Sequence, residues 1–150
     1  MTATTRAGTD MQVRQFHIRS VDAEDRTVTG VAVPFNTEVR INDWLGHYFE
    51  QIAPGACETR EGEPKLFWQH QEIIGRVTDH ADTEDGWQIT ARISDTTAGN
   101  DAYALLKDGA IDRFSIGFVP IEHTTREDAD GIEHITRTRI EVREVSLVPF

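Results

Sequence analysis

Ser115 stands in an alternating segment whose residue types suit a nucleophilic serine. The segment reads Asp112-Arg113-Phe114-Ser115-Ile116-Gly117-Phe118. On a strand, where successive side chains alternate between faces, Phe114, Ile116 and Phe118 share one face and leave Ser115 and Gly117 on the other. Because Gly117 has no side chain, a peptide backbone can approach the Ser115 hydroxyl closely. Ser115 is therefore the candidate nucleophile.

A serine hydroxyl is a weak nucleophile and needs a general base, and His70 is the best candidate among the six histidines. His70 ends the strand predicted for residues 65–70, beside a tight connection to the next strand. Glu144 lies in the last predicted strand, residues 132–148, on a face distinct from its apolar neighbours. Its carboxylate can orient the imidazole and stabilise the imidazolium. These residues predict a triad in the chain order His70, Ser115, Glu144.

From spacing alone, packing explains each of the three residues better than catalysis does. A lone serine in a strand is usually packing filler, and His70 is equally explained as a hydrogen-bonded histidine at a strand end. Glu144 is equally explained as a carboxylate that faces solvent on a sheet. As an alternative nucleophile, Cys57 has no base nearby in the sequence, so it is interpreted as a small packed cysteine.

Metal and cofactor sites are not expected. No two histidines stand three to five residues apart, and Cys57 is the single cysteine, so a converging set of metal ligands is missing. The glycines form no phosphate-binding loop, which argues against a nucleotide cofactor.

Composition restricts the class of protein and its partners. At 150 residues the chain is expected to form one domain, residues 11–150, after a disordered tail, residues 1–10, that has no apolar region of the signal-peptide type. The formal charge of −11, from 26 acidic and 15 basic residues, repels phosphate backbones, so nucleic acid is not expected as a partner. No apolar run is long enough to span a membrane, and a single cysteine fits a reducing cytoplasm.

The elements that must position the candidate residues are mainly strands. In the first half of the chain the sequence predicts an opening hairpin (13–21 with 27–33), a loop to residue 46, a short strand (48–52) and a strand 65–70. In the second half it predicts a hairpin (73–93), a helix from Thr97 capped by Gly109, and strands 111–121 and 132–148. Trp44 in the loop is left as either a lid or a cover over one end of the core. The fold expected is α+β but mainly β: a closed or nearly closed antiparallel barrel of about seven strands with helices packed outside.

The chain also resembles a known family, the prohead proteases of tailed bacteriophages, which are head maturation peptidases related to the herpesvirus assemblins. The segments that carry the resemblance are Gly30 to Phe35, Glu50 to Ala56, Gln69-His70 with Ile74 to Val77, Leu105 to Phe118, and Glu144 to Val148. Together they cover about residues 28–150, and the Lys107-Asp108-Gly109 piece with the serine segment that follows is specific.

The resemblance implies a herpesvirus-protease-like fold and a serine endopeptidase. By resemblance Ser115 is the nucleophile, His70 the base and Glu144 the third member, where the herpesvirus enzymes have a histidine. Family members continue past the closing segment with a Pro-Ala piece and a further tail, so this chain, which stops at Phe150, is expected to be truncated or self-processed at its C-terminus.

The resemblance also implies partners and a location. The substrate would be scaffold, or the scaffold-like N-terminal segment of the major capsid protein, together with the protease itself as oligomer and as self-cleavage substrate. The reaction would take place inside the assembling prohead in the host bacterial cytoplasm. The alternative is an inactive capsid-assembly or scaffolding module with the same fold, in which Ser115 is a relic.

Overall fold

Eleven strands and one helix form the part of the chain that the structure, a computed structural model, describes: residues 12–18, 20–22 and 25–149. In chain order they are β1 (Gln12–His17), β2 (Ser20–Asp22), β3 (Thr27–Pro34), β4 (Val39–Asp43), β5 (Gly46–Ile52), β6 (Cys57–Glu58), β7 (Lys65–Trp68), β8 (Glu72–Asp82), β9 (Gly86–Ile93), α1 (Thr97–Asp108), β10 (Arg113–Glu127) and β11 (Glu133–Val148). The tail predicted for residues 1–10 lies outside the described residues. Within those residues, no helix has the length and apolar character needed to cross a membrane.

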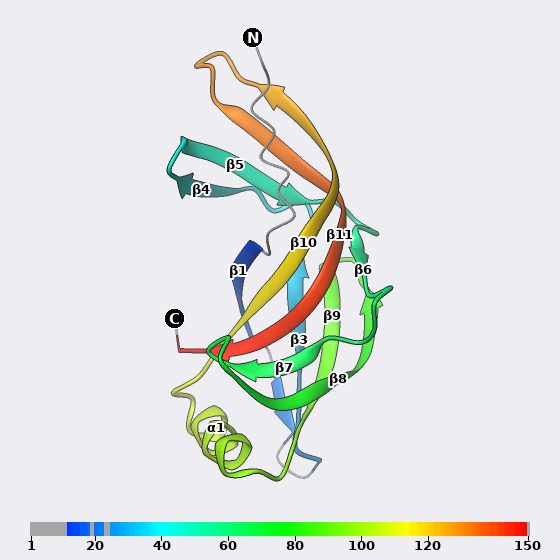
Figure 1. The fold of residues 1–150 in the computed structure, drawn as a ribbon, viewed down its shortest axis with the longest axis vertical. Coiled ribbons are helices and arrows are strands. Elements are labelled where there is room, and N and C mark those ends of the chain that lie inside the picture. The colour runs from blue at the N-terminus through cyan, green and yellow to red at the C-terminus, as the bar shows by residue number, and fades with distance from the viewer. Residues whose placement is uncertain (1–11, 19, 23–24, 150) are drawn as a thin grey trace.

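The long β10–β11 hairpin organises the sheet. The strands follow the order β1-β10-β11-β7-β8-β9-β3-β2, and the short strands β5 and β6 also pair with β11. The hairpin extends along most of the molecule, with α1 near one end and the β4–β5 hairpin near the other (Figure 1). β11 is therefore the central strand, with β10 on one side and β5, β6 and β7 in succession on the other.

The predicted closed or nearly closed antiparallel barrel of about seven strands is wrong. β11 runs parallel to β5, β6 and β7, so the sheet is mixed. β1 comes close to β3, but no hydrogen-bonded ladder joins them among the described residues, and the sheet stays open. Several helices were predicted outside the barrel, but the described residues contain one helix, α1. The strand count was too low because the single strand predicted for residues 13–21 is two strands, β1 and β2, and because β4 and β6 are short segments without a clear alternation of apolar residues.

The opening hairpin was predicted correctly only in its second half. β2 pairs with β3 in antiparallel register, whereas β1 pairs with β10, so that Gln15 lies opposite Ser115. An alternating pattern shows that a segment is extended but carries no information about which strand is its partner. The β1 segment could therefore not be assigned to β10 from its own residues.

The hairpin of residues 73–93 and the helix after it were predicted correctly. β8 and β9 pair in antiparallel register, and Trp87, Ile89, Ala91 and Ile93 alternate into the core. The N-cap Thr96 accepts a hydrogen bond from the Gly99 N–H at 2.9 Å, and Gly109 ends α1 with a left-handed φ of 82°.

Two details of packing differ from the prediction. The spacing of Ala102, Leu105 and Leu106 predicts that these three residues share one buried face of the helix, but Leu105 is 39% exposed, and Tyr103 packs against the core with Ala102 and Leu106 instead. The side chain of Trp44 is 90% exposed at the tip of the β4–β5 hairpin, so it covers no end of the core.

Candidate active site

Strand β10 presents Ser115 on the face opposite the core. Phe114 and Ile116 are fully buried in the hydrophobic core, as the alternation predicted. Ser115 lies opposite Ser146 of β11, and both serines are fully buried as well. The serine hydroxyl is thus fixed by a strand that is anchored on its apolar side.

His70 lies in the tight turn between β7 and β8, and the turn holds it in an unusual backbone conformation. Gln69 and His70 have φ values of 49° and 60°, which residues other than glycine rarely adopt. Two backbone hydrogen bonds tie the turn down: Gln69 N–H donates to the Leu147 carbonyl at 3.1 Å, and Gln71 N–H donates to the Trp68 carbonyl at 3.0 Å. These bonds offset the strain and direct the imidazole back over β11.

The structure brings the three predicted site residues together. His70 Nε2 lies 2.7 Å from Ser115 Oγ, and His70 Nδ1 is hydrogen-bonded to Glu144 Oε1. Glu144 is only 6% exposed. A carboxylate at Nδ1 favours the tautomer with its proton on that nitrogen, which leaves Nε2 free to accept the serine proton. The contacts have the geometry of a nucleophile, a base and an orienting group.

Ser146 is a fourth member of the cluster that the sequence did not reveal. Its Oγ accepts a hydrogen bond from the His70 backbone N–H at 3.1 Å and lies 3.2 Å from His70 Nδ1. The signal available in the sequence was its place two residues after Glu144, which puts both side chains on one face of a strand. Its contact with the backbone of a turn that is distant in sequence could not be foreseen.

Other reactive groups lie elsewhere. Burial, with a further contribution from the Asp82 carboxylate, raises the pKa of the Cys57 thiol well above its usual range, so its thiolate is strongly disfavoured. Within the described part of the chain, no group of three or more potential ligands gathers to hold a metal ion. His80 contacts Glu63 at 3.3 Å, and its ring lies against Trp87.

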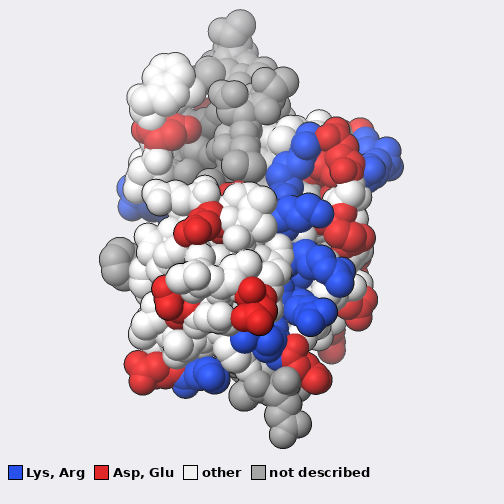
Figure 2. Space-filling view, turned by 60° about the horizontal axis from the view of Figure 1, so that its bottom comes forward, with Lys and Arg blue, Asp and Glu red and all other residues white. Residues whose placement is uncertain are grey.

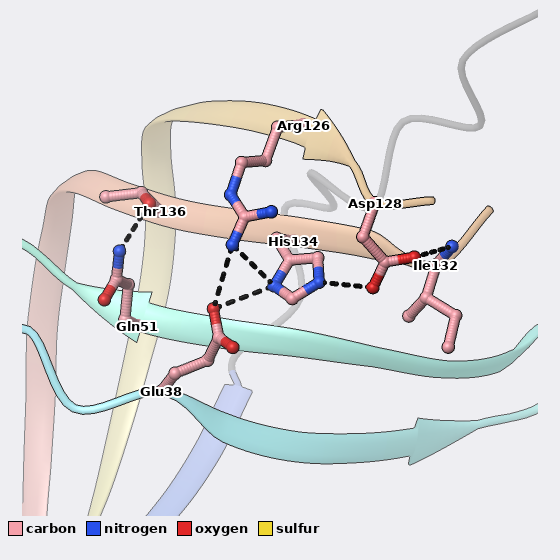
Figure 3. A network of polar contacts seen from close by, with 7 residues as sticks. All are labelled: Glu38, Gln51, Arg126, Asp128, Ile132, His134 and Thr136. Carbon is pink, nitrogen blue, oxygen red and sulfur yellow. Dashed lines mark hydrogen bonds and ion pairs between the residues drawn. The ribbon is translucent and has the colours of Figure 1, made fainter. Parts of the chain in front are cut away.

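His134 forms a separate polar cluster near the turn of the β10–β11 hairpin (Figure 3). Its Nδ1 lies 2.8 Å from Glu38 Oε2 and its Nε2 lies 2.8 Å from Asp128 Oδ2, while its ring stacks on Phe49. The hydrogen bond with Glu38 makes the largest contribution to raising the pKa of His134, and the hydrogen bond with Asp128 raises it further. The same contact with His134 lowers the pKa of Asp128. The cluster joins β11 to the β4–β5 hairpin and contains no nucleophile.

Comparisons with known proteins give a family and a fold for the chain. The family model described as caudovirus prohead serine protease matches residues 14–150. Among solved structures, the bacteriophage T4 capsid assembly protease, gp21, superposes with a TM-score of 0.61 at 9% sequence identity, over 93% of this chain and 96% of that one. At this identity the likeness shows a shared fold. No curated protein matches the chain.

Proposed function

Because the chain belongs to the family of caudovirus prohead serine proteases, we propose that it is a serine endopeptidase that cleaves scaffold, or the scaffold-like N-terminal segment of the major capsid protein, during head maturation. The observation that carries the proposal is the chain of contacts from Ser115 through His70 to Glu144. The T4 structural relative, a capsid assembly protease, is consistent with it.

In this mechanism each group has one task. Ser115 Oγ attacks the scissile carbonyl while His70 Nε2 takes its proton, and the Glu144 carboxylate stabilises the imidazolium that results. The imidazolium then gives the proton to the leaving amine as the C–N bond breaks. A water molecule, deprotonated by the same nitrogen, hydrolyses the Ser115 ester and frees the enzyme.

The partners proposed are the capsid protein with its scaffold segment and the protease itself, as oligomer and as self-cleavage substrate. The reaction would take place inside the prohead, in the cytoplasm of the host bacterium. Enclosure of enzyme and substrate in one shell raises their effective concentration, so tight binding is not required.

The full burial of Ser115 favours a second candidate function. A nucleophile that solvent does not reach is also what an inactive capsid-assembly module with a relic serine would show. The endopeptidase requires the segments that cover Ser115 to admit a peptide.

Co-expression with the major capsid protein of the same phage or prophage tests the proposal. We expect the intact mass of the capsid protein to fall with the wild-type chain and to stay unchanged with Ser115→Ala. Ser94→Ala, which alters an exposed serine in the loop between β9 and α1, is the matched control and should cleave like wild type. Cleavage by Ser115→Ala would refute the nucleophile.

Labelling with a fluorophosphonate, which forms a covalent adduct with a reactive serine, tests whether Ser115 is nucleophilic without a protein substrate. Mass spectrometry should find one adduct on the wild-type chain and on Ser94→Ala, and none on Ser115→Ala. An unlabelled wild-type chain that also leaves the capsid protein intact would favour the assembly module.

A further inference from the structure

Three basic residues lie side by side across neighbouring strands of the sheet. Lys65 of β7 is the register partner of Arg76 of β8, and Arg76 is the partner of Arg92 of β9. Register partners on adjacent strands point to the same face of a sheet. All three side chains are exposed, and strands about 4.8 Å apart place them within a span of about 10 Å. We call these three residues the basic row.

The basic row continues directly from the candidate site. Glu144, the residue that contacts His70, is the register partner of Lys65 on the other side. The next row on the same face contains Ser115, Ser146 and Phe67 in register. A polypeptide bound over Ser115 and extending across β7, β8 and β9 would therefore pass over the basic row.

Folding alone gives no reason for this arrangement. Like charges directly opposite one another on a sheet are destabilising, and the ion pairs among the described residues involve other basic side chains. The chain as a whole carries a formal charge of −11, so a local row of positive charge runs against its composition. Figure 2 shows Lys and Arg side chains gathered in a stripe along one side of the face it displays, with acidic side chains at its borders and scattered over the rest of the face.

We propose that the basic row is a docking surface for an acidic stretch of the polypeptide substrate. The proposal rests on the proposed function, because it assumes that a polypeptide substrate binds over Ser115. Charge complementarity indicates that the part of the substrate over the basic row is acidic. Carboxylates laid over Lys65, Arg76 and Arg92 would relieve the repulsion within the row and align the adjoining segment with Ser115. Substrate choice would thus depend on acidic residues at a distance from the scissile bond.

Binding of a fluorescein-labelled oligoglutamate peptide tests the docking surface without catalysis. Fluorescence anisotropy is measured on the full Ser115→Ala chain and on the same chain with Arg76→Glu, the middle residue of the row. We expect Arg76→Glu to weaken binding about fivefold, and added salt to weaken binding to the parent chain. Arg40→Glu makes the same charge change at an exposed arginine that lies opposite Phe49 on the β4–β5 hairpin, and should bind like the parent.

Thermal unfolding separates docking from a structural role. Arg76→Glu places an acidic residue between Lys65 and Arg92, so Tm should rise by about 2 to 4 °C while peptide binding falls. A lower Tm would show that Arg76 stabilises the fold, and would overturn the inference.

Two further outcomes decide the proposal. Equal binding of oligoglutamate by Arg76→Glu and Arg40→Glu would overturn it, and so would a labelled single-stranded oligonucleotide that binds the row more tightly than oligoglutamate does. Because these measurements use Ser115→Ala, a wild-type chain that neither reacts with fluorophosphonate nor cleaves the capsid protein would refute the peptidase and leave the binding result to stand by itself.

Discussion

At the scale of single residues, the left-handed backbone of His70 determines the geometry of the site. Such a conformation costs about 1 to 3 kcal/mol in a residue other than glycine, and here the hydrogen bond from His70 N–H to Ser146 Oγ helps to hold it. The conformation lets one imidazole reach Ser115 and Glu144 with its two nitrogens. The strained backbone of His70 thus accompanies the alignment of its imidazole between Ser115 and Glu144.

Substitutions at the base and at the orienting carboxylate should have unequal effects. We expect His70→Ala to lower kcat for capsid-protein cleavage by about 10⁶-fold, because no other group accepts the serine proton. Glu144→Gln should cost about 10⁴-fold, since the imidazole keeps its position but loses the charge that stabilises its cation. Single-turnover cleavage followed by mass spectrometry measures both.

His80→Ala is the control for this comparison, because His80 pairs with Glu63 on another part of the sheet. It should retain wild-type kcat. Equal losses in His70→Ala and Glu144→Gln, or a larger loss in Glu144→Gln, would contradict the assigned roles.

The sequence allowed the choice of Ser115, His70 and Glu144 but not of Ser146. Alternation placed Ser115 and Glu144 on defined faces of their strands, and the family resemblance selected them with His70 over packing explanations that spacing alone preferred. Ser146 acts on the backbone of a residue 76 positions away. A contact of that kind depends on tertiary structure and leaves no local pattern.

At the scale of elements, the His134 cluster fastens the β4–β5 hairpin to the β10–β11 hairpin. Glu38 lies just before β4, Phe49 is on β5, and His134 and Asp128 belong to the other hairpin and its turn. Arg126 also approaches this cluster, at 3.2 Å from His134 Nδ1. The joint between the two hairpins therefore depends on a titrating group.

This joint predicts how stability changes with pH. The pKa of His134 is raised in the folded state, so its contribution is complete below 6.5 and is lost as the pH rises through the folded value. The pKa of Asp128 is lowered, so its contribution is complete above 3.8 and is lost as the pH falls through its folded value. We expect the Tm difference between wild type and His134→Gln to be largest between these limits and to shrink at alkaline pH.

His123→Gln serves as the control, because His123 also lies on β10–β11 but has no ion-pair partner among the described residues. This substitution measures how loss of an imidazole elsewhere on the hairpin changes Tm. A Tm difference between wild type and His134→Gln that stays flat between pH 5 and pH 8 would rule out the titrating joint. Differential scanning fluorimetry in a series of buffers makes both measurements.

Local elements were predictable from the sequence, and long-range pairing was not. The β8–β9 hairpin and α1 carry their own turn residues, caps and alternation, which act within a few residues. The parallel pairing of β11 with β5, β6 and β7 joins segments that are far apart in the sequence. Alternation does not distinguish parallel from antiparallel partners, so the predicted barrel was wrong although most of its strands exist.

At the scale of the whole molecule, the central position of β11 should make it the most protected part of the fold. Its second half is paired on both sides, with β10 and with β6 and β7. In native-state hydrogen exchange we expect backbone amides of residues 140–147 to exchange only through global unfolding. Amides of α1 and of the β4–β5 hairpin should exchange faster, through local opening.

Exchange at low concentrations of guanidinium checks the assignment. The opening free energy of the β11 amides should fall with denaturant with the slope of global unfolding, whereas the slope for α1 should be shallow. Protection in α1 equal to that in β11 would show a fully cooperative unit and contradict this ranking.

The central strand is also made later than every strand it pairs with, which affects the biosynthesis of the protein. A chain leaves the ribosome from its N-terminus, so β5, β6, β7 and β10 are all exposed before β11 appears. Ser115 and His70 emerge earlier, but the turn that holds His70 is tied to Leu147 and Ser146, and Glu144 belongs to the same late segment. A nascent chain therefore has no assembled site, and translation itself delays assembly of the site until β11 is released.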